Sequence, residues 1–421
     1  MTPIGELVLD ALRAHPHRVA FVHAGTALSY RDTEERVLGL VELLAKLPPG
    51  DTVVQIRRND PLQWLVNAAC YVAGCRSAAI PPGTLSEAGI AERLDLIGAA
   101  TVLTDVDIPA PGGPVAVASA DTVVRLAFTS GTTGPVKGVE LSSGALGAVA
   151  IMLRDTLPWP DHPRVLCPEP VSGGFGNMVA PTLSLGGTFI IPERSDVDSV
   201  LDAVIEYHPT VLMMMPPVLR AVLNHPRSGG VDWSDVTLVI YSGASLTSDE
   251  VDRAHVLFGE VLCQVFGQVE VPKTIAWSSP ADHGGDRRSS LGRPFPGTEI
   301  RISGPDGTPL PAGHAGELWV RGPNTASSYA FPPGSPVHDG WLRTGDVCRF
   351  DDDGYLHYVD RVQHVLRVGG AYVCPADIEA EILARTGRPI GVLAAGPETV
   401  RFVPGGLPRD VMGRIDRRRP E

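Results

Sequence analysis

The chain has 421 residues, 43% of them hydrophobic and 20% charged, which is typical of a globular protein with two or three domains. Its net charge of −13 and its few aromatic residues argue against a nucleic acid as partner. No apolar run reaches the roughly 18 residues of a membrane span, and the N-terminus lacks the pattern of a signal peptide. We therefore expect a cytoplasmic protein without a membrane partner, whose six scattered cysteines are reduced.

Helix and strand patterns alternate along the first part of the chain. Amphipathic or apolar helical periodicity covers residues 4–14, 30–47 and 62–73. Short apolar runs typical of buried strands cover residues 19–22, 52–56, 101–104 and 122–128. This alternation predicts an α/β fold, with a parallel-rich sheet covered by helices on both faces.

The alternation resumes further along the chain and then changes character. Strands are expected at 165–167, 187–191, 211–215 and 236–241, and helices at 198–207 and 218–224. From about residue 290 to 361, frequent Gly, Pro and Asp and short strands predict a small β subdomain. We expect residues 1–361 to form a large N-terminal domain and residues 362–421 a reduced C-terminal α+β lid.

A loop rich in Gly, Ser and Thr follows the predicted strand at 122–128. It runs from Thr129 to Lys137 and exposes backbone N–H groups and hydroxyls that can surround an anion. The chain contains three lysines among 35 basic residues, and one of them is Lys137 in this loop. A lysine there supplies a mobile charge for a phosphate. The spacing differs from that of the common P-loop, so the loop indicates a nucleotide site of another kind, the alternative being a flexible surface loop.

Four later segments carry groups that suit a nucleotide. Residues 241–245 are small and follow a strand, and residues 264–270 offer an aromatic ring and a carboxylate after another strand. Glu270 is a candidate Mg²⁺ ligand. Asp346 lies in a predicted turn where it can accept hydrogen bonds from a ribose, and Arg361 can reach the same sugar or a phosphate. Each alone is also explained as a turn, surface or core residue, but their joint occurrence favours a nucleotide site.

In combination these motifs resemble the adenylate-forming superfamily, which includes acyl- and aryl-CoA synthetases, adenylation domains of nonribosomal peptide synthetases, and luciferases. The similarity covers nearly the whole chain. The segments that carry it are Thr129–Lys137, Phe266–Glu270, Trp341–Asp346, Asp360–Arg361, Val368–Glu379 and Leu407–Arg417. The resemblance implies that a carboxylate attacks the α-phosphate of MgATP, giving an acyl-adenylate and pyrophosphate, after which a thiol or another nucleophile displaces AMP.

The resemblance also implies roles for particular residues. Lys137, Glu270 and Arg414 are the expected catalytic residues, with Glu270 holding Mg²⁺. The expected ATP-binding residues are Thr129, Ser130, Gly131, Thr132, Thr133, Gly134, Gly243, Ala244, Ser245, Phe266, Gly267, Asp346 and Arg361. The expected acid-binding residues are Phe175, Gly176, Asn177, Ser242 and Gln268. CoA or a phosphopantetheine carrier protein is the expected acceptor.

The chain departs from the family pattern in several places. Val269 stands where the family has a threonine, Arg414 where it has the C-terminal catalytic lysine, and Gln363 at the hinge. About 28 residues separate Glu379 from Leu407, fewer than the family usually has. A guanidinium is broader than an ammonium and does not simply replace it at a crowded carboxylate–phosphate junction. These departures leave open whether the acceptor is CoA, a carrier protein or an amine.

The acid is predicted from the segment at residues 170–177. Its Gly-rich sequence resembles that of benzoate-type aryl-CoA ligases and lacks the aspartate with which adenylation domains bind an amino group. We therefore expect ATP-dependent activation of an aryl or other small carboxylic acid, followed by transfer to a thiol. The alternatives are an amide-forming ligase and a degenerate member that binds nucleotide without catalysis.

Overall fold

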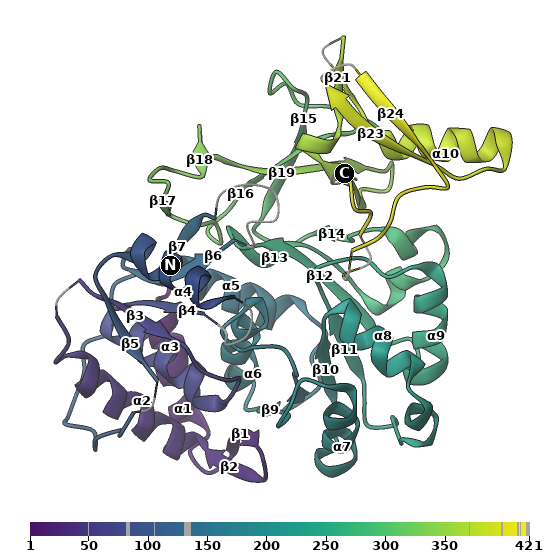
Figure 1. The fold of residues 1–421 in the computed structure, drawn as a ribbon. Helices are drawn as coiled ribbons and strands as arrows, with labels where there is room; N and C mark the ends of the chain where they lie inside the picture. The colour runs from purple at the N-terminus through teal and green to yellow at the C-terminus, as the bar shows by residue number, and fades with distance from the viewer. Residues whose placement is uncertain are drawn as a thin grey trace.

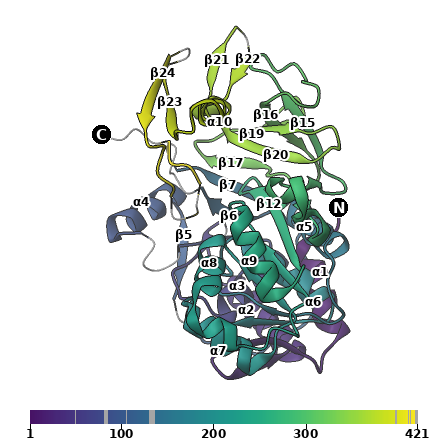
Figure 2. The same cartoon turned by 90° about the vertical axis from the view of Figure 1, so that its right-hand side faces the viewer.

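Among the described residues, three sheets have five or more strands. The computed structural model describes residues 1–48, 50–80, 85–104, 106–129, 136–369, 371–396, 399–410, 412 and 414–417. Two α/β sheets with their helices form the lower part of the view in Figure 1, and an antiparallel sheet and the C-terminal segment lie above them. Figure 2 shows the same division after a quarter turn, with the C-terminal strands β23 and β24 at the top.

The largest sheet of the described residues has nine strands in the order β14-β13-β12-β11-β10-β8-β9-β1-β2. The six strands from β12 to β1 are parallel, and antiparallel strands complete both ends. Their bounds are β1 Val19–His23, β2 Thr26–Ser29, β8 Arg164–Leu166, β9 Thr188–Ile191, β10 Val211–Met214, β11 Leu238–Tyr241, β12 Leu262–Gln268, β13 Val271–Ser278 and β14 Arg293–Pro294. Strands β10 and β11 are buried along their whole length, as expected of parallel strands covered on both faces.

The second α/β sheet has six strands within the described part of the chain, in the order β17-β7-β6-β4-β3-β5. They are β3 Thr52–Gln55, β4 Arg76–Ala79, β5 Ala100–Leu103, β6 Val123–Phe128, β7 Gly138–Ser142 and β17 Ser328–Phe331. Strand β17 comes from the segment that we predicted as a β subdomain, yet it pairs antiparallel with β7. The β-rich segment therefore shares strands with the α/β part.

The third sheet is antiparallel and carries the C-terminal segment. It contains β15 Glu299–Ser303, β16 Gly316–Arg321, β18 Val337–His338, β19 Trp341–Phe350 and β20 Leu356–Arg361. After the short helix η5 Val362–His364 come two small hairpins and one helix. These elements are β21 Leu366–Val368, β22 Ala371–Val373, α10 Pro375–Thr386, β23 Ile390–Gly396 and β24 Thr399–Pro404.

Helices cover the two α/β sheets. They are α1 Ile4–Ala14, α2 Tyr30–Leu44, α3 Pro61–Ala73, α4 Glu87–Ile97, α5 Ser143–Thr156, α6 Val179–Ser184, α7 Val197–Tyr207, α8 Pro216–Asn224 and α9 Ser248–Phe258. The predicted helices and strands of the first half are confirmed, with ends displaced by a few residues. Side-chain caps fix several starts: the Asp60 carboxylate accepts from the backbone N–H of Gln63 at 3.0 Å at the start of α3.

The sequence analysis missed helices α4, α5, α6 and α9 and gave no bounds for α10. Helix α5 contains Gly144 and Gly147, which weaken a helical pattern. A Cβ at Gly147 would lie 2.0 Å from the carbonyl oxygen of Thr2, so glycine is needed for the N-terminal segment to pack there. Helix α9 buries only the narrow stripe of Val251, Ala254 and Phe258.

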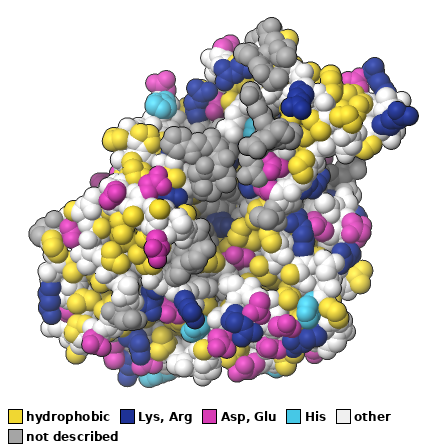
Figure 3. Space-filling model, viewed as in Figure 1, with side chains coloured by type: hydrophobic (Ala, Val, Ile, Leu, Met, Phe, Trp, Pro, Cys, Tyr) yellow, Lys and Arg dark blue, Asp and Glu magenta, His cyan; other side chains and the backbone are white. Residues whose placement is uncertain are grey.

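The surface carries charges of both signs. Acidic and basic side chains are interspersed on the face shown in Figure 3. None of the helices in the described ranges is long and apolar enough to cross a membrane.

Candidate active site

Thr129 and Lys137 close the neck of the predicted phosphate loop. Strands β6 and β7 pair antiparallel up to Phe128 and Gly138. The backbone N–H of Thr129 donates to the carbonyl of Lys137 at 3.1 Å, and the N–H of Lys137 donates to the Thr129 hydroxyl at 3.1 Å. Both ends of the loop are therefore held together at one point. The loop residues Ser130, Gly131, Thr132, Thr133 and Gly134 lie outside the described residues.

Glu270 lies at the tip of the hairpin that joins β12 to β13. Gln268 pairs with Val271, so Val269 and Glu270 form a two-residue turn. A Cβ on Gly267 would lie 2.3 Å from the backbone nitrogen of Lys273, which only glycine tolerates. The segment at 264–270 does not follow a strand, as the sequence suggested, because its first five residues are the end of β12.

Tyr329 joins Glu270 to Lys137. Its hydroxyl donates to Oε1 of Glu270 at 2.9 Å, and the Lys137 ammonium lies 5.0 Å from the centre of its ring. Glu270 is 7% exposed, and burial followed by the Glu270 charge raises the pKa of Tyr329, so the phenol stays protonated. The sequence analysis missed Tyr329, whose place depends on the pairing of β17 with β7, where Tyr329 faces Val139.

Asp346 and Arg361 form the second pair. They lie opposite each other on β19 and β20, and Arg361 Nε is 3.1 Å from Oδ1 of Asp346. Gln268 Nε2 donates weakly to Oδ2 of Asp346 at 3.5 Å, so this predicted acid-site residue lies against the predicted ribose carboxylate. Asp346 is 4% exposed. Burial raises its pKa to about 6 despite the opposing charge of Arg361, and the nearby Glu270 charge adds to the increase.

The predicted adenine segment follows β11. Ser242 is buried, and Gly243 has a positive φ of 97° that favours glycine. Ser245 accepts a hydrogen bond from Gln264 at 3.4 Å, and the binding role of Ala244 stays a prediction. Phe266 is partly buried and packs against the core of the antiparallel sheet, so its stacking on a base stays a prediction.

The C-terminal segment reaches this site. A Cβ on Gly243 would lie 3.0 Å from Cε of Met412, and Arg220 donates to the Met412 carbonyl at 3.0 Å. Arg414 forms an ion pair with Asp410 at 2.8 Å, while its side chain is half exposed. The charge of Arg414 is also close enough to act on Asp346. The structure thus brings Arg414 to the side of the site where Asp346 and Glu270 lie.

The predicted acid segment forms the short helix η1 Gly174–Met178. A Cβ on Gly176 would lie 1.8 Å from the carbonyl oxygen of Val171, which explains the glycine. Arg125, a buried residue of β6 that the sequence analysis missed, donates to the carbonyls of Ser172 and Gly173 and to Oδ1 of Asn177. Phe175 is buried, with the Lys273 ammonium 3.9 Å from its ring centre.

The Glu270 carboxylate fits a metal ion that is bound together with a nucleotide. Within the described ranges, no group of three or more His, Cys, Asp or Glu residues is placed to hold a metal ion by itself. Mg²⁺ is commonly bound by one or two carboxylates plus substrate phosphates. Glu270, on a turn beside the end of the phosphate loop, suits that arrangement.

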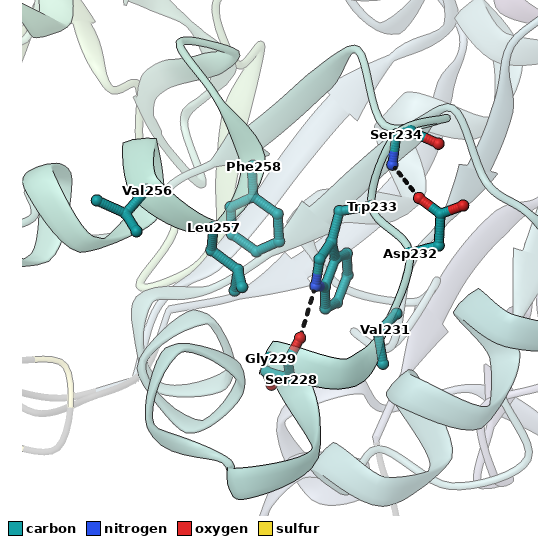
Figure 4. A pocket seen from close by; sticks show the side chains of 9 residues that line it. All are labelled: Ser228, Gly229, Val231, Asp232, Trp233, Ser234, Val256, Leu257 and Phe258. Atoms are coloured by element: carbon teal, nitrogen blue, oxygen red, sulfur yellow. Dashed lines mark hydrogen bonds between the residues drawn. The ribbon is translucent and has the colours of Figure 1, made fainter.

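One pocket lies away from these residues. It is formed by η2 Pro226–Gly230, the loop after it and the end of α9, around the Trp233 indole, which donates to the Ser228 carbonyl at 2.9 Å (Figure 4). None of the predicted site residues lines it.

The comparisons with known proteins define the class of this protein. The family model described as "AMP-binding enzyme" matches residues 105–330, more than half of the chain. The chain belongs to the AMP-binding enzyme family. This confirms the predicted adenylate-forming superfamily and an α/β enzyme that activates an acid.

Individual relatives narrow the class. A feruloyl-CoA synthase from Amycolatopsis sp is 30% identical over 417 residues, covering 91% of this chain and 84% of that protein. An indoleacetate–CoA ligase from Aromatoleum aromaticum is 30% identical over 343 residues, covering 80% of this chain and 64% of the relative. Together with the family, they support an enzyme of the acid–thiol ligase type.

Solved structures confirm the fold. The amide bond synthetase from Marinactinospora thermotolerans aligns with a TM-score of 0.80 and 26% identity, covering 99% of this chain and 98% of that one. An O-succinylbenzoate coenzyme A synthetase from Bacillus subtilis aligns with a TM-score of 0.82 over 99% of this chain and 97% of the other, at 20% identity.

Proposed function

We propose that this enzyme activates an aryl or other small carboxylic acid with MgATP and transfers the acyl group to CoA. In the first step a carboxylate oxygen forms a bond to the α-phosphorus, and the bond to the departing pyrophosphate breaks. In the second step a thiolate sulfur forms a bond to the acyl carbon, and the bond between that carbon and AMP breaks. Because two anions meet in the first step, cations and N–H groups must offset their charges.

The observation that carries the proposal is the contact chain from Lys137 through Tyr329 to Glu270. It places an ammonium and a buried carboxylate beside the neck of a loop suited to phosphates. In the proposed roles, Lys137 and the loop bind the β- and γ-phosphates, and Glu270 holds Mg²⁺. When bound, the metal would neutralise charge on phosphate oxygens.

The Asp346–Arg361 pair supports the position of the nucleoside. A carboxylate held at 3.1 Å by Arg361 Nε still has lone pairs free for the ribose hydroxyls. Residues 242–245 follow a strand of the neighbouring sheet, and Met412 lies against Gly243. We propose that adenine lies between these elements, with the C-terminal segment covering it.

The aryl class of the acid is supported by two observations. The segment 170–177 contains no acidic residue that would bind a substrate amine, and the preceding Glu169 lies close enough to Lys273 for the lysine charge to act on it. The names of two relatives, feruloyl-CoA synthase and indoleacetate–CoA ligase, describe carboxylic acids that carry an aromatic ring. Phe175, Gly176 and Asn177 are the proposed acid-binding residues.

Amide formation is the second candidate for the transfer step. It is favoured by the structural similarity to an amide bond synthetase over nearly the whole chain. The first step is the same in both cases, so the acceptor decides between them. A carrier-protein thiol is a further acceptor of the same chemistry as CoA.

ATP–pyrophosphate exchange with a panel of benzoates, cinnamates, fatty acids and amino acids tests the proposal. We expect exchange with aryl acids, its loss in Glu270→Ala and a marked decrease in Lys137→Ala. The exposed Lys46 and Glu260 provide matched controls, and Lys46→Ala and Glu260→Ala should keep the wild-type rate. Unchanged exchange in both site variants would refute the assignment. Mass analysis with CoA or an amine then identifies the acceptor.

A further inference from the structure

Lys273 is one of three lysines in a chain that otherwise uses arginine for its basic residues. Its backbone has a φ of 64°, in the left-handed region that residues other than glycine seldom adopt. The residue lies in β13 where the pairing with β12 shifts register, between the pairs Phe266–Ala276 and Gln268–Val271. Such irregularities redirect side chains near active sites. The backbone thus adopts an unfavourable conformation at the position that carries this ammonium.

The side chain extends to the proposed acid site. Its Nζ lies 3.9 Å from the centre of the Phe175 ring. A Cβ on Gly174 would lie 3.1 Å from Cε and 3.4 Å from Nζ of Lys273, so the glycine leaves room for the lysine. A cation over an aromatic face gains modest energy, but a ring offers no lone pair to the three N–H donors of the ammonium.

Glu169 is the acidic residue whose charge acts on Lys273. The two residues act on each other electrostatically, yet among the described residues the Lys273 ammonium forms no ion pair. Glu169 is held in place by the backbone N–H of Met215, which donates to Oε1 at 3.0 Å. Burial lowers the pKa of Lys273 to about 8, and burial raises the pKa of Glu169. The lysine is therefore a cation whose hydrogen-bonding capacity is not used by a carboxylate.

We infer that Lys273 is a specificity-determining residue. Its ammonium donates a hydrogen bond to a hydroxyl group of the aryl acid, at a position remote from the reacting carboxylate. The inference rests on the proposed function, because it places the acid beside Phe175. A hydroxyl suits the pair because it accepts from Lys273 and can donate to the Glu169 carboxylate. A second carboxylate on the acid would add a negative charge next to Glu169 and is disfavoured. The substrate class is thus a hydroxylated aryl acid.

Matched acids test the inference. The pairs are 4-hydroxybenzoate with benzoate and 4-hydroxycinnamate with cinnamate, and the readout is kcat/KM in ATP–pyrophosphate exchange. Because a hydrogen bond to a charged group is strong, we expect the wild-type enzyme to favour one hydroxylated acid over its partner by about tenfold or more.

Lys273→Met keeps the side-chain length and the backbone strain. It should reduce the preference to about twofold by slowing the hydroxylated acid, with the KM for ATP unchanged. Lys46→Met is the matched control.

Several outcomes overturn the inference. They are a wild-type enzyme without hydroxyl preference, an unchanged preference in Lys273→Met, and a folded Lys273→Met that activates neither acid of a pair. In the last case the lysine acts on the reacting carboxylate. Should Lys273→Met not fold, Glu169→Gln and calorimetric binding of both acids to the wild type answer the same question.

Failure of the proposed function is recognised separately. In that case no acid supports exchange in the wild type, whereas calorimetry of the acid pairs still reports whether a hydroxyl strengthens binding and whether Lys273→Met removes that effect. A hydroxyl effect in binding without exchange supports the role of Lys273 and refutes acid activation. Absence of the effect refutes the role of Lys273.

Discussion

Arg417 reaches back across 57 residues to Asp360 and donates a hydrogen bond from Nε to Oδ2. The same guanidinium binds Glu379 of α10 through Nη1 at 2.7 Å and the Val392 carbonyl at 2.6 Å, and its side chain is 2% exposed. Although burial alone would raise it, the pKa of Asp360 is held below its usual value by His364 and the Arg417 charge. One buried arginine thus fastens the C-terminal segment to the end of β20, next to Arg361.

Arg417→Ala should therefore loosen the C-terminal segment. Removing one partner leaves buried carboxylates uncompensated, which typically costs about 3–5 kcal/mol. We expect faster proteolysis after residue 361 and a lower melting temperature. Arg385→Ala is the control, since Arg385 forms an exposed pair with Glu381 on the same helix and should change stability by about 0.5 kcal/mol or less. Equal protease resistance of the two variants would show that the arginine does not hold the segment.

Asp346→Asn should make the ligand-free protein more stable at pH 7.5. The folded-state pKa of Asp346 is raised to about 6 from 3.8 by burial, so the folded protein holds this proton more tightly than the unfolded chain. The contribution of Asp346 to stability therefore falls as the pH rises from about 4 to about 6. The variant escapes this loss, which amounts to about 2–3 kcal/mol.

Urea unfolding of both proteins at several pH values measures this effect. The increase in the free energy of unfolding caused by Asp346→Asn should be near zero at pH 4 and reach its full size above pH 6. The affinity of the variant for ATP should fall. Asp352→Asn, at an exposed position, should show neither change. A less stable Asp346→Asn at pH 7.5 would contradict the burial argument.

Tyr329→Phe should weaken the response to magnesium. The variant removes the hydroxyl that holds Oε1 of Glu270 but keeps the ring beneath the Lys137 ammonium. We expect about a tenfold loss of exchange activity at low Mg²⁺, from a hydrogen bond to a charged group. Tyr329→Leu also removes the ring and should lose a few-fold more.

Titrating Mg²⁺ in the exchange assay separates the two effects, with Tyr207→Phe as a control on α7, which lies at the opposite end of the molecule in Figure 1. Identical magnesium curves for Tyr329→Phe and the wild type would mean that the hydroxyl does not position Glu270.

Arg414→Ala should slow adenylate formation. Its charge acts on Asp346, and it is paired with Asp410 at 2.8 Å, so it approaches the site from the C-terminal segment. We expect at least a tenfold lower exchange rate, with partial recovery in Arg414→Lys because an ammonium keeps the charge. A variant slowed only in thiol transfer, or not slowed at all, would assign Arg414 another role.

Much of the fold follows from local sequence patterns. Buried parallel strands such as β10 and β11 are continuous apolar runs, and the capped helices show their periodicity. Helix α5 escaped prediction because Gly144 and Gly147 serve a close contact with another segment rather than helix propensity. That contact is visible only once the chain is folded.

The candidate site likewise contains residues that the sequence predicts and residues that only the structure reveals. Glu270, Asp346 and Arg361 belong to motifs of consecutive residues, and a resemblance finds them. Tyr329, Arg125 and Lys273 are positioned by strand pairing and by a register shift between strands distant from their partners. No spacing in the sequence records such pairing, so their contacts with the site residues had to come from the structure.

The pairing of β17 with β7 also has a consequence for the order of synthesis. Ser328 bonds to Glu140, 188 residues earlier, so β7 is an open sheet edge until the ribosome has made β17. Tyr329 arrives with that same strand. A nascent chain that ends earlier lacks the link between Lys137 and Glu270 and exposes a strand that invites pairing with other chains. The contact chain from Lys137 through Tyr329 to Glu270 and the protection of this sheet edge therefore both depend on the synthesis of β17.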